Sequence, residues 1–219
     1  PYGYDQRTLA VVPAIAVSLA PSSAIMAIDS PQKMVTLRAE VVNNREGKSD
    51  GLLTLKVPPG WTVSPAAQPF ALTRAGERAL YEFQVRAATI DYRAARIEAV
   101  AQSGGREYRE GYTTIRHRDL ETRYLYTDAV TTVRGVDVRI APGLRVGYVM
   151  GIGDDVPAGI AQLGAHVQLL GEQDLATGDL SRFNAIITGT RAYAVRGDLR
   201  TYNRRLLDYV NLIELQRIP

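Results

Sequence analysis

Residues 34–42 read Met-Val-Thr-Leu-Arg-Ala-Glu-Val-Val, and from Val35 to Val41 every second residue is apolar. Successive side chains of a β-strand point to opposite faces of the sheet, so this alternation predicts a strand with one buried and one solvent-facing side. The next five residues, Asn-Asn-Arg-Glu-Gly at 43–47, have the composition of a turn. The stretch therefore predicts a strand of a two-sided antiparallel sheet.

Further strand patterns occur on the C-terminal side of this stretch, at 52–57, 79–86, 93–101 and 107–116. Short strands at this spacing, with no helical period between them, are typical of a sandwich of two sheets. We therefore predict an immunoglobulin-like β-sandwich over residues 11–117. An N-terminal lead at 1–10 precedes it, and a connector at 118–143 follows it, with strand-like pieces at 124–126 and 136–140.

The pattern changes at Leu144. Residues 144–150 are predominantly apolar, as expected of a buried parallel strand, and a helix pattern follows from Val156, with Asp155 as a candidate N-cap. Two more strands are predicted at 166–170 and 185–188, and then a helix that begins near Asp198. This order predicts a parallel α/β domain of the flavodoxin-like or amidotransferase-like type over residues 144–219.

The end of this α/β pattern is unusual. Residues 209–213 read Tyr-Val-Asn-Leu-Ile and pass from a helical to an apolar, strand-like pattern without a glycine turn. We therefore expect that residues are missing near position 210 and that the α/β domain is incomplete. The chain begins Pro-Tyr-Gly, without Met, so we expect it to be a piece of a longer protein.

Composition narrows the possible functions. Hydrophobic residues make up 46% of the chain, which is enough for a sizeable core, and the net charge is +3. Basic residues are spread along the chain between acidic ones, so we predict no nucleic-acid binding. The chain has no cysteine, which excludes a cysteine nucleophile, a thiolate metal site and a disulfide. The longest apolar stretch, 9–26, is interrupted by Pro13 and Pro21, so no membrane span is expected.

The candidate ligand site lies where the first and third parallel strands end. Open parallel sheets bind ligands beyond the carboxyl ends of their strands. The residues predicted to meet there are Gly151, Gly153, Asp154, Asp155, Thr190, Arg191 and Tyr193. The guanidinium of Arg191 could bind an anion, or it could form an ion pair with one of the two aspartates. A dinucleotide-binding motif is not favoured, because Val156 occupies the position of its third glycine.

Three further features have a structural and a functional interpretation. Trp61, after the turn Pro58-Pro59-Gly60, could stack on a sugar ring, although packing at the edge of the sandwich core is favoured. The histidines, His117 and His166, have no partner at metal-ligand spacing, so a structural role is favoured. Four tyrosines predict packing between domains or, less readily, contact with a sugar; they are Tyr108, Tyr112, Tyr124 and Tyr126.

Several motifs carry a resemblance to a known family. They are Gly-Leu-Arg-Val-Gly-Tyr-Val-Met-Gly-Ile-Gly-Asp-Asp-Val-Pro at 143–157, Gly-Asp-Leu-Ser at 178–181, Thr-Gly-Thr-Arg-Ala-Tyr at 188–193 and Asn-Arg-Arg-Leu-Leu-Asp-Tyr-Val at 203–210. Together they resemble the C-terminal region of large bacterial LmbE/PIG-L family deacetylases, where an amidotransferase-like domain follows a β-sandwich. Val-Pro-Pro-Gly-Trp-Thr-Val-Ser-Pro at 57–65 resembles the α-galactosidase-associated sandwich module.

The resemblance implies an accessory role. The family's deacetylase domain holds zinc through a Pro-His-Pro-Asp-Asp/Glu type motif, and this motif is absent from the chain. We therefore expect no catalytic residues and no cofactor here, with zinc in a separate catalytic domain. The expected partners are that domain and a glycan or cell-wall polysaccharide, in an extracellular or periplasmic location. Two alternatives are an enzyme whose active residues lie outside this chain and a purely structural interaction module.

Overall fold

The computed structural model describes residues 9–30, 33–118 and 120–217, which divide into two compact units. Among these described residues, the first unit comprises 9–24 and 33–135, and the second comprises 25–30 and 136–217.

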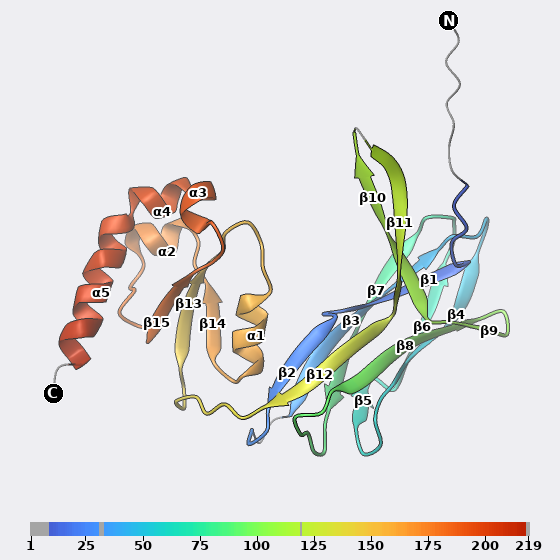
Figure 1. Ribbon diagram of the computed structural model, residues 1–219, viewed down its shortest axis with the longest axis horizontal. Coiled ribbons are helices and arrows are strands. Elements are labelled where there is room, and N and C mark those ends of the chain that lie inside the picture. The colour runs from blue at the N-terminus through green and yellow to red at the C-terminus, as the bar shows by residue number, and fades with distance from the viewer. Residues whose placement is uncertain (1–8, 31–32, 119, 218–219) are drawn as a thin grey trace, which may run out of the picture. The chain divides into compact units, whose positions relative to one another are not determined.

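The first unit is a sandwich of two antiparallel sheets with the strand orders β1-β3-β7-β5 and β2-β12-β8-β4-β6, in which β2 begins in this unit and its residues 25–27 are assigned to the second; β9 pairs with β8 (Figure 1). Its strands are β1 (Ile15–Ala20), β2 (Ser23–Ala27), β3 (Met34–Asn43), β4 (Ser49–Lys56), β5 (Thr62–Ser64), β6 (Ala67–Leu72), β7 (Arg78–Arg86), β8 (Ala95–Ser103), β9 (Arg106–Tyr108) and β12 (Val130–Val136). The first order matches the A-B-E-D sheet of an immunoglobulin domain, and β12-β8-β4 matches its G-F-C sheet. The predicted immunoglobulin-like sandwich is confirmed.

Alternating apolar residues form the core of the sandwich, as the sequence pattern predicts. In β3 the side chains of Leu37 and Val41 are fully buried, and in β7 those of Phe83 and Val85 are fully buried. Leu37 lies directly opposite Phe83 in the antiparallel register of the two strands. Side chains paired in this way contact each other on the buried face, so β3 and β7 form the centre of one layer.

The sandwich extends further along the chain than predicted. Residues 120–136, predicted as part of a connector, form β11 (Leu120–Asp128) and β12, and β12 pairs with β8 inside the second sheet. The boundary at 117 is therefore wrong. The alternation in β12 was hidden because one of its buried positions is a threonine, Thr131. The strand predicted at 136–140 is also wrong, because β12 ends at Val136.

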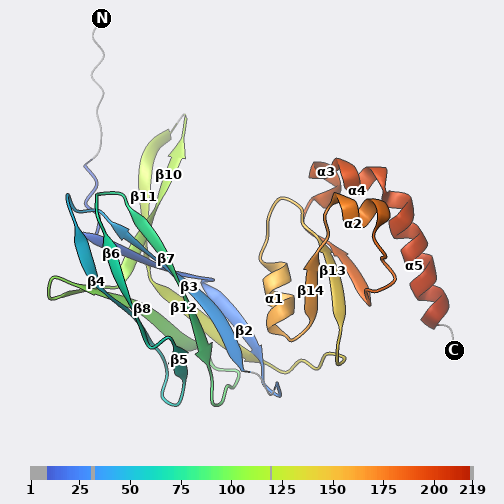
Figure 2. The ribbon, with the colours of Figure 1, turned by 180° about the vertical axis from the view of Figure 1, so that it is seen from behind.

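Strands β10 (Glu110–His117) and β11 form a hairpin that extends beyond the ends of the neighbouring strands (Figures 1 and 2). The ring centroids of Tyr112 and Tyr124 lie 5.8 Å apart. The Tyr112 hydroxyl donates to Asn44 Oδ1 at 2.9 Å, and the Tyr126 hydroxyl donates to the Val11 carbonyl at 2.5 Å. Tyr112 and Tyr126 are therefore held on their own sandwich by their hydroxyl groups.

A buried asparagine organises one end of the sandwich. The Asn43 side chain is fully buried, and its amide nitrogen donates to the carbonyl oxygens of Gly47 at 2.8 Å and Arg74 at 3.2 Å. Its amide oxygen accepts bonds from the Arg45 backbone N–H and the Ser49 hydroxyl, each at 3.0 Å. One side chain thus joins the turn after β3 to the loop before β7.

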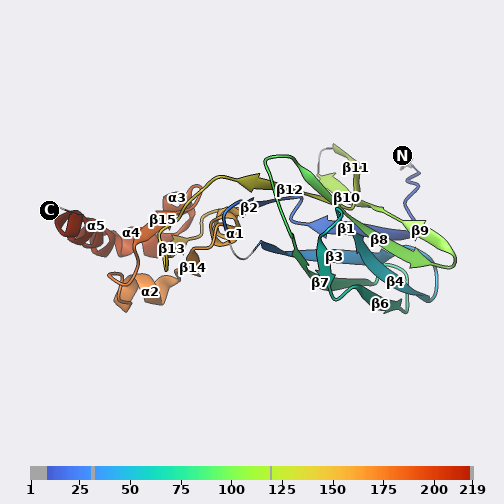
Figure 3. The ribbon, with the colours of Figure 1, turned by 90° about the horizontal axis from the view of Figure 1, so that it is seen from below.

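The second unit contains a three-stranded parallel sheet with the order β14-β13-β15. Its elements are β13 (Arg145–Val149), α1 (Val156–Gln162), β14 (His166–Leu169), α2 (Glu172–Thr177), β15 (Ala185–Thr188), α3 (Ala192–Val195), α4 (Gly197–Thr201) and α5 (Asn203–Arg217). The connection through α1 runs to one side of β13, and the connection through α2 crosses to the other side. Right-handed crossovers therefore place α1 and α2 on opposite faces of the sheet (Figure 3).

The helices differ from the prediction in three ways. Helices α2 and α3 had no predicted counterpart, and the helix predicted from Asp198 is divided at Tyr202 into α4 and α5. Helix α5 continues to Arg217, so the strand-like ending predicted near 212–213 is wrong. Leu206, Tyr209 and Ile213 pack on the core of this unit at helical spacing, which explains why the helix continues.

Candidate functional site

The loops after β13 and β15 meet, as the parallel topology predicts. The backbone N–H of Ile152 donates to the Thr190 carbonyl at 3.1 Å. A Cβ atom on Gly151 would lie 1.9 Å from the same carbonyl oxygen, so only glycine allows this approach. Gly153 has a φ of +104°, which also favours glycine. The two predicted halves of the site are therefore in direct contact.

Asp154 holds these loops together. Its carboxylate accepts bonds from the Tyr148 hydroxyl at 2.8 Å, the Val156 N–H at 3.2 Å and the Thr190 N–H at 3.4 Å. Burial and the hydrogen bond to Asp154 raise the pKa of Tyr148, so this phenol remains a donor at neutral pH. Asp155 occupies the predicted N-cap position of α1 but makes no side-chain capping bond. The backbone N–H of Val156, the first residue of the helix, donates to the Asp154 carboxylate instead.

Arg191 has the backbone of a strand-to-helix elbow. It precedes α3, and its φ of 56° lies in the left-handed region, which costs an L-amino acid about 1 kcal/mol. Its guanidinium makes no hydrogen bond or ion pair with the described residues, so the alternative of a bridge to Asp154 or Asp155 is wrong. The Tyr193 hydroxyl turns to Asn203 Oδ1, at 2.6 Å.

Sequence reasoning missed an ion pair at the same edge of the sheet. The Arg196 guanidinium lies 3.4 Å from the carbonyl oxygens of Met150 and Leu170, which follow β13 and β14. Its Nε donates to Asp198 Oδ1 at 2.8 Å, and the Asp198 side chain is 11% exposed. Arg196 and Asp198 are two positions apart in the sequence, a spacing that matches no helical pattern of ion pairs, so the pairing could not be recognised from sequence.

This pair predicts a pH-dependent stability. The hydrogen bond from Arg196 lowers the pKa of Asp198 in the folded state. The contribution of the ion pair to the free energy of unfolding is therefore fully present above the pKa of an unfolded aspartate, near 4. It is lost as the pH falls through the lower pKa of Asp198 in the folded state. We expect Asp198→Asn to lower the free energy of unfolding by about 2 kcal/mol at pH 7 and by less at a pH below the folded pKa of Asp198. Urea denaturation at several pH values would measure this. Asp208→Asn, at an exposed position of α5, is the matched control, and an equal loss at both pH values would contradict the assignment.

In the sandwich, Trp61 follows a tight turn. Its backbone N–H donates to the Pro58 carbonyl at 3.2 Å, and Gly60 has a φ of +79°, as in a type II turn with Pro59 before the glycine. The indole is half-buried. This partial burial agrees with packing at the edge of the sandwich and leaves part of the ring accessible.

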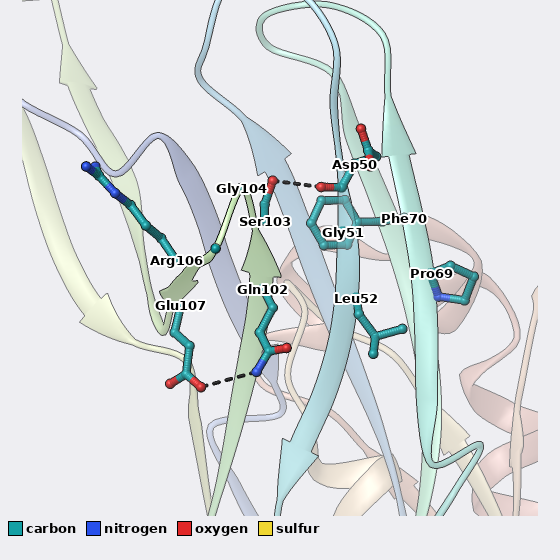
Figure 4. Close-up of a pocket in the computed structure, with 11 residues that line it drawn as sticks. Asp50, Gly51, Leu52, Pro69, Phe70, Gln102, Ser103, Gly104, Arg106 and Glu107 are labelled. Atoms are coloured by element: carbon teal, nitrogen blue, oxygen red, sulfur yellow. Dashed lines mark hydrogen bonds between the residues drawn. The ribbon is translucent and has the colours of Figure 1, made fainter.

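The outer face of the second sheet carries an open groove of about 730 Å³ (Figure 4). Its lining comes from β4, β6, β8 and β9 and includes Asp50, Leu52, Pro69, Gln102 and Glu107. Trp61 does not line it. The groove was not predicted, because it depends on which residues lie opposite each other on neighbouring strands.

Residues 9–30, 33–118 and 120–217 contain no group of three or more His, Cys, Asp or Glu side chains that could hold a metal ion. No helix among these residues is long and apolar enough to span a membrane.

No family model and no curated protein matches the chain. Among solved structures it is similar to a FixG-related protein from Vibrio parahaemolyticus, with 11% identity, a TM-score of 0.36, and coverage of 57% of this chain and 98% of that one. The PapD-like domain 7 of human CEP192 has 8% identity and a TM-score of 0.32, with 64% and 100% coverage. The E. coli chaperone DraB has 13% identity and a TM-score of 0.31, with 58% and 59% coverage. The immunoglobulin-like class of the sandwich is assigned from the strand order of this chain and not from these similarities.

Proposed function

We propose that this chain is a non-catalytic accessory region of an exported N-acetyl-sugar deacetylase of the LmbE/PIG-L type. In this proposal the sandwich binds a glycan of the cell surface, and the α/β unit is an enzyme-like fold that serves as a scaffold for the catalytic domain of the same protein. The motifs at 143–157 and 188–193 support the family, and the location would be extracellular or periplasmic.

The α/β unit is the first support for a scaffold. Its strand order β14-β13-β15 corresponds to the 2-1-3 beginning of the flavodoxin-like order 2-1-3-4-5, in which ligands bind between the first and third strands. Amidotransferase-like folds carry their nucleophile at a strand-to-helix elbow, and here the elbow between β15 and α3 carries Arg191. Guanidinium is always protonated and is not a nucleophile.

One observation carries the proposal: the Asp154 carboxylate, which would face a ligand between the two loops, is already hydrogen-bonded to residues of both loops. Asp154 is bound by Tyr148, Val156 and Thr190, and Gly151 lies against Thr190. A ligand between these loops would have to break those bonds. The described residues offer no cluster of three His, Cys, Asp or Glu side chains for zinc, which in this proposal belongs to the separate catalytic domain.

Calorimetric titration of the purified chain with chitin oligomers and peptidoglycan fragments tests the glycan role. We expect saturable heat with at least one of them and no release of acetate from either. Because the chain has one tryptophan, fluorescence in the same titration reports on the surroundings of Trp61. Acetate release would contradict the accessory role, and the absence of heat with every saccharide would contradict glycan binding.

A further inference from the structure

The groove on the sandwich contains an ordered row of side chains. Leu52 of β4 lies directly opposite Pro69 of β6 and Gln102 of β8, and Gln102 lies opposite Glu107 of β9. Directly opposed residues point to the same face of a sheet, so these four side chains form one line across four strands. Neighbouring strands are about 4.8 Å apart, and the row therefore spans about 14 Å.

The row is apolar at one end and polar at the other. Leu52 is 40% exposed and Pro69 is also exposed, so they form an accessible apolar surface. At the other end, Gln102 Nε2 donates to Glu107 Oε1 at 3.2 Å, and Figure 4 shows this bond on the groove wall. Glu107 is also held by Arg109 and, at 3.6 Å, by Lys56. These contacts hold the polar end in place before a ligand arrives.

Asp50 adds an unused acceptor to the groove. Two residues before Leu52 on the same strand, it points to the same face, and its carboxylate makes no hydrogen bond or ion pair with the described residues. Its backbone carbonyl accepts the Ser103 hydroxyl at 2.7 Å, which fixes the strand at this point (Figure 4). The groove thus offers a free carboxylate, a held amide and an apolar surface.

This set selects a class of ligand. Arg109 and Lys56 already neutralise Glu107, and Arg106 also lines the groove, so the charge disfavours an anion only beside the unpaired carboxylate of Asp50. A purely apolar ligand would remove that carboxylate from water without a partner. An extended peptide normally binds by adding a strand to a sheet edge, which here is β6, whereas the row from Leu52 to Gln102 lies on the face of the sheet over β4 and β8. A sugar ring combines hydroxyl donors at its rim with an apolar C–H face, and both have counterparts here.

We propose that this groove is a saccharide-binding site, in which Asp50 and Gln102 hydrogen-bond to sugar hydroxyl or amino groups and Leu52 and Pro69 contact the ring face. The site rests on the glycan role proposed above and gives that role a location away from Trp61.

The experiment is a titration of the ¹⁵N-labelled chain with chitin tetramer and, separately, with its de-N-acetylated counterpart. We expect saturable chemical-shift changes at the Gln102 side-chain amide and at the backbone amides of Gly104 and Gly105, in the turn beside it. The two sugars distinguish recognition of hydroxyl groups, which both share, from recognition of an amino group by Asp50. Changes confined to the Trp61 turn would overturn the proposal and leave the glycan role intact.

Variants give an independent measurement by calorimetry. We expect Asp50→Ala and Gln102→Ala each to weaken saccharide binding about tenfold, the effect of losing one good hydrogen bond. Gln84→Ala, at an exposed position on the other sheet, is the matched control, and Trp61→Ala should also retain binding. Unchanged affinity in both groove variants would overturn the site alone. No binding of any saccharide by the unmodified chain would overturn the site and the glycan role together.

Discussion

Replacing Asn43 by leucine is expected to lower the free energy of unfolding of the sandwich by about 3–4 kcal/mol. The side chain is fully buried and makes four hydrogen bonds, and each buried polar group left without a partner costs about 1–3 kcal/mol. Leucine has the same branching and the same number of side-chain heavy atoms, so it leaves no cavity at this position. Urea denaturation followed by the fluorescence of Trp61, which lies in the same unit, would measure it.

The control for Asn43→Leu is the neighbouring residue. Asn44 is half-buried and makes two side-chain bonds, with the Pro13 carbonyl and the Tyr112 hydroxyl. We therefore expect Asn44→Leu to cost about 1–2 kcal/mol. If the two substitutions cost the same, the special role of Asn43 in joining the turn after β3 to the loop before β7 would be refuted.

Gly151→Ala is expected to separate the two loops of the α/β unit and to cost about 2–3 kcal/mol. A Cβ atom at this position would lie 1.9 Å from the Thr190 carbonyl oxygen, which no rotamer can relieve, and overpacking of this kind forces the backbone to move. The bond from Ile152 to Thr190 and the bond from Thr190 to Asp154 should then weaken. Hydrogen exchange of the Ile152 and Thr190 amides would show lower protection.

Gly159→Ala is the matched control, because it makes the same chemical change in the same unit. Gly159 lies within α1, and an added Cβ would meet no atom within 4 Å. Alanine favours a helix by about 1 kcal/mol over glycine, so this variant should be as stable as the parent chain or more stable. Retained protection at Ile152 in Gly151→Ala would show that the contact between the loops does not require glycine.

The sequence predicted those strands whose apolar residues alternate without interruption. Met34–Asn43 and Arg78–Arg86 were recognised because their buried positions are apolar. Strand β12 was missed because a polar residue, Thr131, occupies one of its buried positions and so interrupts the apolar alternation. The threonine can be buried because its hydroxyl donates to the Pro21 carbonyl at 2.7 Å. The end of α5 was missed because an apolar stretch following a helix fits a strand as well as a further helical turn.

The candidate sites were predictable only as far as topology determines them. The meeting of Gly151 and Asp154 with Thr190 follows from parallel strands, whose carboxyl ends share one edge. The hydrogen bond from Tyr148 to Asp154 could not be foreseen, because nothing in the sequence of β13 distinguishes Tyr148 from the other buried residues of that strand. The groove depends on cross-strand register, and no local pattern specifies that Leu52 lies opposite Gln102.

The placement of the hairpin β10–β11 has a consequence for how this sandwich tolerates change. The hairpin lies between β8 and β12, which pair with each other directly, and its base is closed by the Ala129 N–H donating to the Arg109 carbonyl at 2.8 Å. Neither sheet needs the hairpin to set its register. Tyr112 and Tyr126 hold the base of the hairpin on the sandwich, so only the part beyond them can lengthen, shorten or change its surface without disturbing the two sheets.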